Sequence, residues 1–166
     1  MACHVTASPN HETHRETPLK YRFDVAMTGR LGFELNPRRL SADEVAFAKR
    51  AVEDYKLIRP IVQLGDLYRL VSPYEKPYAS LLYVDEMKSR AVLFVLGLDR
   101  DGSLVDTLSL SGLDPDAYYT IKEINRGKKL HARHSVCVSG RELLEHGLET
   151  LLFGRYDSAV FEISRR

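Results

Sequence analysis

The side chains that could do chemistry in this chain gather first in a histidine-rich stretch near its start. His11, Glu12 and His14 fall within a few residues of one another, and His4 lies shortly before them. A helical zinc site needs the spacing His-Glu-x-x-His, which places both imidazoles on one face, one turn apart. Here the second histidine comes one residue too early, on a segment that Pro9 interrupts. The spacing favours a hydrogen-bonded loop, and we expect no metal site and no other cofactor.

Tyrosine is the second residue type that could serve a site, because aromatic rings stack on sugar faces. The tyrosines of the later part of the chain are Tyr68, Tyr74, Tyr78, Tyr83, Tyr118, Tyr119 and Tyr156. Their alternation along strand-like runs is more typical of core and cross-strand packing than of a sugar-binding surface. The chain also has no tryptophan, the largest aromatic platform for a sugar face.

The histidine-rich stretch leads into a predicted helix with both ends marked. Thr17 stands at an N-cap position and Pro18 at the first helical position, where its missing N–H is no loss. Apolar residues repeat at helical spacing over 19–27, and Gly29 stands where a left-handed residue closes a helix. A short strand follows over 31–35. Loop, helix and strand together predict one step of an α/β winding.

A second helix is predicted after Pro37. It begins at Ser41, with Glu44 three residues later, which is the pattern of a capping box. Apolar residues repeat at helical spacing as far as Ile58, and Pro60 is expected to stop the helix.

From Ile61 onward the apolar pattern changes to that of strands. Clear runs rich in Tyr, Leu and Val lie at 67–72, 78–84, 91–96, 118–124 and 159–163, with weaker runs at 104–110 and 136–138. Consecutive short strands without helical crossovers favour an antiparallel sandwich or sheet. The change of period places the boundary between 62 and 66 and divides the chain into domains 1–62 and 63–166.

Composition narrows the class of protein. The 166 residues include 24 basic and 23 acidic ones, for a net charge of +1. This balance argues against nucleic-acid and anionic-membrane partners. No apolar run reaches the length of a membrane span, and residues 1–20 hold no signal-peptide core. Cys3 and Cys137 predict buried free thiols of a reducing compartment, so we expect a cytoplasmic protein.

Several short motifs occur along the chain, and both their residues and their order help to classify it. They are HVTASPNHET at 4–13, TPL at 17–19, VAM at 25–27, GRLGFEL at 29–35, IRP at 58–60, GDLYRL at 65–70, GLDP at 112–115 and YDSAVF at 156–161. In this order they resemble the last part of the catalytic barrel and the C-terminal β domain of glycoside hydrolase family 36 α-galactosidases. The chain departs from the family at Ala2, where the family has glycine, and over 99–109.

The resemblance implies both a fold and an activity. The fold is mixed: a remnant of a (β/α)8 barrel, as loop, helix, strand and helix, followed by an all-β, antiparallel, sandwich-like domain. The activity is that of a retaining α-galactosidase, which hydrolyses terminal α-galactosyl residues of oligosaccharides such as the raffinose series without a metal. In the family the two catalytic aspartates precede the segment that resembles His4 onward. No catalytic residue is therefore expected in this chain, which should be inactive alone, and Met1 is expected to be internal to a longer parent.

The resemblance leaves supporting roles for a few polar residues. His4, Asn10, His11 and Glu34 are the candidates for the rim or the surroundings of the substrate site. Glu34 would end a barrel strand, where catalytic groups gather in such barrels. A carboxylate that ties the strand end to nearby backbone or to Arg30 is the favoured alternative, because a position in a fold does not make a site.

Two other functions stay open: a free-standing carbohydrate-binding β module, and a structural or assembly element. In a chain without the rest of a barrel, two helix stripes are expected to lie uncovered, which predicts self-association into a homo-oligomer. These stripes are Leu19, Phe23 and Ala26, and part of Val45, Ala48 and Val52. The β region is expected to be more stable than residues 1–35.

Overall fold

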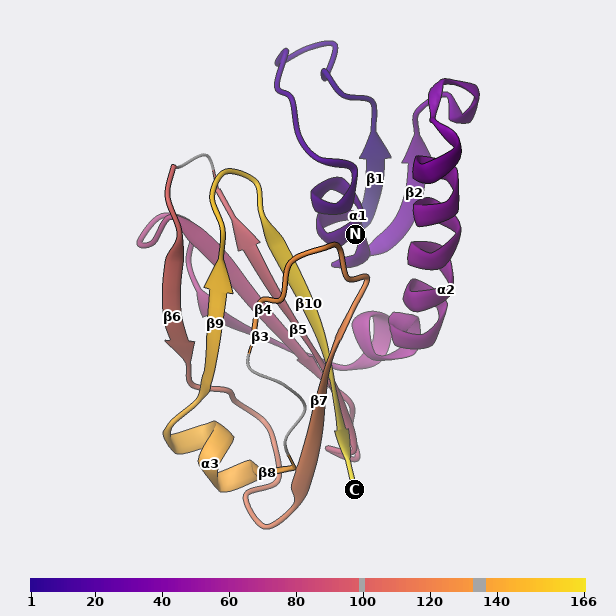
Figure 1. Cartoon of the computed structure of the whole chain (residues 1–166). Coiled ribbons are helices and arrows are strands. Elements are labelled where there is room, and N and C mark those ends of the chain that lie inside the picture. The colour runs from indigo at the N-terminus through magenta and orange to yellow at the C-terminus, as the bar shows by residue number, and fades with distance from the viewer. Residues whose placement is uncertain (99–100, 133–136) are drawn as a thin grey trace.

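The computed structural model describes residues 1–98, 101–132 and 137–166, and it has the expected mixed architecture (Figure 1). A short α/β unit comes first and an antiparallel β domain follows. The elements are β1 Ala2–Thr6, α1 Leu19–Met27, β2 Arg30–Glu34, the 3-10 helix η1 Pro37–Arg39, α2 Ala42–Leu64, β3 Asp66–Val71, β4 Tyr78–Val84, β5 Arg90–Gly97, β6 Leu104–Leu108, β7 Tyr118–Ile124, β8 Val138–Ser139, α3 Gly140–Glu145, β9 Leu148–Leu152 and β10 Ser158–Arg165.

The first unit is a parallel strand, helix and strand. β1 pairs in parallel with β2, and the register sets Val5 beside Phe33 and Thr6 beside Glu34. α1 connects the two strands and packs on both. The sequence did not reveal β1 as a strand. Its pairing partner, β2, comes after α1 in the chain, and the residues of β1 alone show no strand pattern.

The ends of α1 differ from the prediction. Pro18 is the N-cap residue, without a capping side chain, and Thr17 lies outside the helix. The Thr17 N–H instead donates to Ser8 Oγ at 3.0 Å. Gly29 does not have a positive φ. A Cβ at this position would lie 2.7 Å from the carbonyl oxygen of Met1, so the close approach of the chain start accounts for the glycine.

α2 begins as predicted and ends later. Ser41 Oγ accepts a hydrogen bond from the Glu44 N–H, and Glu44 Oε2 accepts one from the Ser41 N–H, which confirms the capping box. The expectation that Pro60 stops the helix was wrong, since the helix runs through it. Ile58 and Ile61, on either side of the proline, are buried. Their packing outweighs the single backbone hydrogen bond that the proline removes.

The β domain is built on one six-stranded antiparallel sheet in the order β3-β4-β5-β10-β7-β8. β4 and β7 have the predicted bounds, and β3, β5 and β10 differ from the prediction by one or two residues at their ends. β6 pairs with β9 in a separate two-stranded sheet. The sequence predicted neither α3 nor β9. The weak run at 136–138 lies partly outside the described residues, and β8 begins at its last residue.

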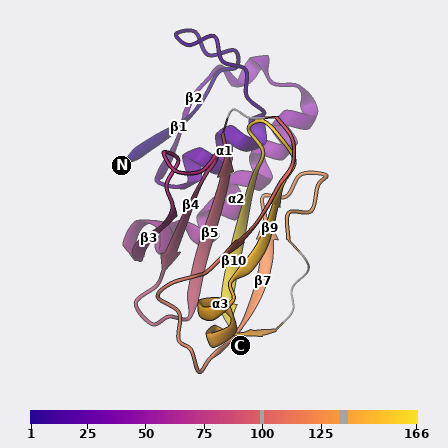
Figure 2. The same ribbon diagram turned by 90° about the vertical axis from the view of Figure 1, so that its left-hand side faces the viewer.

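Both faces of the six-stranded sheet are covered, as Figures 1 and 2 show. α1 and α2 cover one face, where Phe23 and Phe94 belong to one buried cluster. β6, β9 and α3 cover the other face, where Leu93, Leu143 and Leu152 belong to a second cluster. Neighbouring residues of β5 alternate between the two clusters, so this strand is apolar along its whole length.

The covering of the first face corrects one expectation. Phe23 and Ala26 were expected to lie uncovered, but both are buried in the cluster shared with the sheet. α1 contacts β1 and β2 as well as β5 and β10, so the β domain itself supplies the cover. Val45, Ala48 and Val52 of α2 are half-buried. These three side chains are therefore only partly covered, as expected.

Both cysteines are free thiols in the structure. Cys3 is half-buried and Cys137 is exposed, so the expectation of two buried thiols was wrong for Cys137. Among the helices that the structure describes, none combines the length and the hydropathy that crossing a membrane requires.

Candidate functional site

β1 and β2 present one apolar face and one polar face. Val5 belongs to the buried cluster that α1 shares, and Leu31 packs against it. Because successive side chains of a strand point to opposite faces, His4 and Glu34 lie on the other face. The strands run parallel, so their carboxyl ends meet at one edge, where catalytic groups gather in α/β barrels. The polar face is the one that a closed barrel would turn inward.

The structure brings two of the four candidates together on this face. His4 Nδ1 lies 3.8 Å from Glu34 Oε2, and both side chains are at least half exposed. The structure thus pairs Glu34 with His4 and not with Arg30. The imidazole lies across Gly32, where a Cβ would come within 2.5 Å of His4 Cδ2. The resulting open pair of an imidazole and a carboxylate can hydrogen-bond the hydroxyl groups of a sugar.

The other two candidates lie in the loop after β1. Asn10 Oδ1 accepts hydrogen bonds from the N–H groups of Glu12 and Thr13, at 3.0 and 2.9 Å, and from Thr13 Oγ1 at 3.1 Å. This side chain therefore shapes its own loop. His11 is exposed, and its Nε2 lies 3.8 Å from Glu12 Oε1. The described residues contain no cluster of three or more side chains that could ligate a metal.

A buried carboxylate that the sequence did not single out joins α1 to the β domain. Asp24 is fully buried. Its oxygens accept hydrogen bonds from Lys20 Nζ at 2.5 Å, Ser158 Oγ at 2.7 Å and Asn125 Nδ2 at 2.5 Å. Burial raises the pKa of Asp24, against the opposing effects of Lys20, Ser158 and Asn125. The available signal was an acidic residue directly after Phe23 within an apolar helical repeat.

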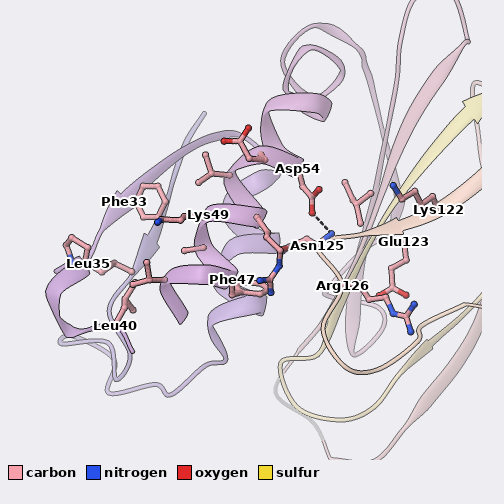
Figure 3. Close-up of a pocket in the computed structure, with 17 residues that line it drawn as sticks. Phe33, Leu35, Leu40, Phe47, Lys49, Asp54, Lys122, Glu123, Asn125 and Arg126 are labelled. Atoms are coloured by element: carbon pink, nitrogen blue, oxygen red, sulfur yellow. Dashed lines mark hydrogen bonds between the residues drawn. The ribbon is translucent and has the colours of Figure 1, made fainter. Parts of the chain in front are cut away.

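An apolar groove of about 830 Å³ lies beside α2 (Figure 3). Phe33, Phe47 and Val52 are among its apolar lining residues. Its polar end includes Asp54, whose Oδ2 accepts a hydrogen bond from the backbone N–H of Asn125 at 2.8 Å. The groove therefore runs from β2 and α2 to the end of β7.

Most of the tyrosines considered as a sugar platform pack inside the protein. Tyr78 and Tyr119 are almost completely buried, and Tyr74 and Tyr118 are exposed. Burial raises the pKa of Tyr78, and its hydroxyl donates to Asp106 Oδ2 at 2.7 Å. This packing matches the structural interpretation of the tyrosine pattern.

The structure thus combines a parallel β-α-β-α unit, which has one polar strand face, with an antiparallel β domain. Residues 78–163 match the glycosyl hydrolase family 36 C-terminal domain, and residues 1–65 match the melibiase family. The chain belongs to glycoside hydrolase family 36, as the resemblance implied.

Relatives with curated names are α-galactosidases. α-Galactosidase C of Emericella nidulans is 34% identical over 168 residues, which cover 100% of this chain and 21% of the relative. α-Galactosidase AgaA of Geobacillus stearothermophilus is 38% identical over 123 residues, which cover 74% of this chain and 17% of the relative. The chain thus spans about a fifth of the length of the curated relatives it matches.

Solved structures show the same arrangement. The family 36 α-galactosidase AgaB of Geobacillus stearothermophilus superposes with a TM-score of 0.86 at 31% identity, covering 100% of this chain and 22% of that one. AgaA variants of the same organism, solved with stachyose and with raffinose, superpose with a TM-score of 0.85 at 31% identity.

Proposed function

We propose that this chain supplies the closing part of the catalytic barrel and the C-terminal β domain of a retaining α-galactosidase. The parallel pair β1 and β2 carries the proposal. In the part of the chain that the structure describes, neither strand has a second partner. Parallel strands are stable in larger sheets that are covered on both faces, so two of them alone make an incomplete unit. Further barrel strands would pair with the free edges and bring the catalytic carboxylates.

The substrates in this proposal are oligosaccharides with terminal α-galactosyl groups. AgaA, which has been solved with stachyose and raffinose, supports this substrate class. His4 and Glu34 would line the inner wall near the sugar, and Asn10 would shape the loop that carries His11. A retaining mechanism works through two carboxyl groups and uses no cofactor. We place the domain boundary between 62 and 66, where α2 gives way to β3.

A chimera tests the proposal. This chain would replace the matching segment of AgaB, and raffinose hydrolysis would be compared with that of intact AgaB and of AgaB lacking the segment. We expect the chimera to hydrolyse raffinose and the deletion variant to be inactive, because a barrel without its last two strands cannot hold its carboxylates in place. A chimera that unfolds cooperatively, as an intact protein does, but releases no galactose would overturn the proposal.

For the chain on its own, we propose that a second copy covers the groove beside α2. The groove has an apolar floor, and its rim carries both signs of charge, including Lys49, Glu53 and Arg126. A rim of mixed charge suits the self-complementary contact of a two-fold dimer. Apolar surfaces of this kind favour association in water.

Val52→Asp is expected to weaken this dimer by at least about tenfold in dissociation constant, because it places a charge on the groove floor. Sedimentation over a range of concentrations measures the effect. Leu64→Asp is the matched control, since Leu64 is exposed on the same helix and does not line the groove. Equal effects of the two variants, or a wild-type chain that stays monomeric at every concentration, would contradict the assignment.

A further inference from the structure

A buried histidine held between two carboxylates lies in the β domain, away from the barrel strands. His131 Nδ1 lies 2.6 Å from Glu123 Oε1 of β7, and His131 Nε2 lies 3.1 Å from Asp157 Oδ2, just before β10. The His131 side chain is 1% exposed and that of Glu123 is 5% exposed. We call these three residues the His131 clasp.

The geometry favours the protonated imidazole in the clasp. Only the protonated imidazole has an N–H at both ring nitrogens, and here each nitrogen faces a carboxylate. Burial by itself lowers the pKa of His131, but the hydrogen bonds and charges of Asp157 and Glu123 outweigh it and raise the pKa above its ordinary value. Burial raises the pKa of Asp157, but hydrogen bonds from His131 and from the Phe153 N–H, together with the nearby positive charges, lower it below its ordinary value. With His131 protonated, the clasp is a cation held between two carboxylate side chains.

The clasp fixes two backbone segments. The His131 N–H donates to Glu123 Oε2 at 3.2 Å, and the His131 carbonyl accepts from the Leu151 N–H at 2.7 Å. Asp157 Oδ2 also accepts from the Phe153 N–H at 2.8 Å, which closes the turn over 153–157. That turn is not a relaxed one, since Tyr156 has a φ of 47°. Side-chain bonds therefore hold the turn in its shape.

The turn over 153–157 contacts the α/β unit. The ring of Tyr156 lies 5.5 Å from that of Tyr21 on α1. Arg155 and Tyr156 line a cavity of about 630 Å³ together with residues 13–16 and Pro18 of the loop after β1. This loop starts at the carboxyl end of β1, the edge where His4 and Glu34 lie. The turn thus lies beside the loop that follows that edge.

We propose that the His131 clasp is a proton-dependent positioning device: with His131 protonated it closes the turn over 153–157, and the closed turn holds the loop after β1 in place. Loss of the proton would leave Glu123, with a buried side chain, and the partly buried Asp157 as two anions facing a neutral ring. Of the other described charges near the clasp, Lys129 lies with its Nζ 5.0 Å from the centre of the Phe153 ring. Its charge acts on Asp157 in the same direction as His131 does.

The proposal fixes a direction for the pH dependence. The pKa of folded His131 is raised, so the contribution of the clasp is complete below the ordinary imidazole value of about 6.5 and is lost as the pH rises through the folded-state pKa. The lowered pKa of Asp157 keeps that carboxylate charged until the solution is well below neutral pH. The loop after β1 should accordingly be ordered while His131 is protonated and loosen as the pH rises through the folded-state pKa of His131. Any effect of the clasp on catalysis rests on the proposed function, whereas the pH dependence of the turn and the loop does not.

Amide hydrogen exchange on the 166-residue chain tests the clasp without any activity assay. Rates at 13–17 and 153–157, divided by the intrinsic rate at each pH, should rise at least about tenfold across the titration of the His131 ring followed by NMR, since one unit of pKa coupling is a factor of ten. In His131→Gln the same amides should exchange fast at every pH. His146→Gln, which removes an exposed histidine, should behave as wild type.

Two further readouts keep the test decisive. Amides of β4 and β5 should stay protected in His131→Gln, which separates release of the turn from unfolding. Asp157→Asn removes one of the two anions, so the midpoint of the loop transition should move to lower pH together with that of the His131 ring. Exchange at 13–17 that is independent of pH, or that follows pH without following the His131 ring, would overturn the proposal. Failure of the AgaB chimera would leave this result untouched.

Discussion

The 166-residue chain, purified on its own, is expected to hydrolyse an aryl α-galactoside no faster than buffer does. A retaining glycosidase needs two carboxyl groups about 5 to 5.5 Å apart across the scissile bond. At the carboxyl ends of β1 and β2 the structure places Glu34, whose Oε2 lies 3.8 Å from His4 Nδ1. Asp24 is fully buried among hydrogen-bond donors and faces no open site. The expected loss relative to an intact enzyme is the whole catalytic acceleration, at least about 10⁶-fold.

The assay is release of the aryl group by the pure chain, with the AgaB chimera as the positive control. Turnover above the buffer rate that disappears in Glu34→Ala would show that the chain carries its own catalytic group. Turnover that persists in Glu34→Ala and in Asp24→Ala would indicate a contaminating enzyme.

The second large effect is expected at Asp24, where Asp24→Ala should lower the free energy of unfolding by about 3 to 5 kcal/mol. The substitution leaves Lys20 without its ion-pair partner and removes the acceptor of Ser158 Oγ and Asn125 Nδ2. These donors come from α1, from β10 and from the end of β7, so the loss loosens the contact between the two parts of the chain. Denaturation in urea measures the change.

Asp116→Ala is the control for Asp24→Ala. Asp116 forms an exposed ion pair with Arg141, and such pairs contribute at most about 1 kcal/mol. Asp24→Asn keeps the size of the side chain and one acceptor oxygen, so its cost should fall between those of the other two variants. A cost for Asp24→Ala no larger than that for Asp116→Ala would contradict the role assigned to the buried carboxylate.

Local patterns in the sequence predicted most of the elements. The capping box at Ser41 and Glu44 is a short-range signal, and the structure contains it. The strands of the large sheet carry continuous or alternating apolar runs, which the two covered faces require. The family resemblance added what local patterns could not, namely that the first residues belong to a barrel.

The features that the sequence missed depend on contacts between distant segments. β1 is a strand because β2 pairs with it, and α2 passes through Pro60 because its flanking residues pack on the sheet. Phe23 is buried by the β domain instead of a missing barrel segment. The partners of Asp24 and of His131 include residues far away in the chain, Ser158 and Asp157 respectively. Composition and periodicity carry no information about which distant residues come into contact in the fold.

The central claim is that β1 and β2 are two strands of a barrel that other strands complete. Amide hydrogen exchange measured in the chain alone and in the AgaB chimera tests it most directly. In the chain alone, amides of β1 and β2 that face the free edges should exchange fast, while those of β4 and β5 exchange slowly. In the chimera, the same edge amides of β1 and β2 should become as protected as β5, whereas equal rates in the two proteins would contradict the claim.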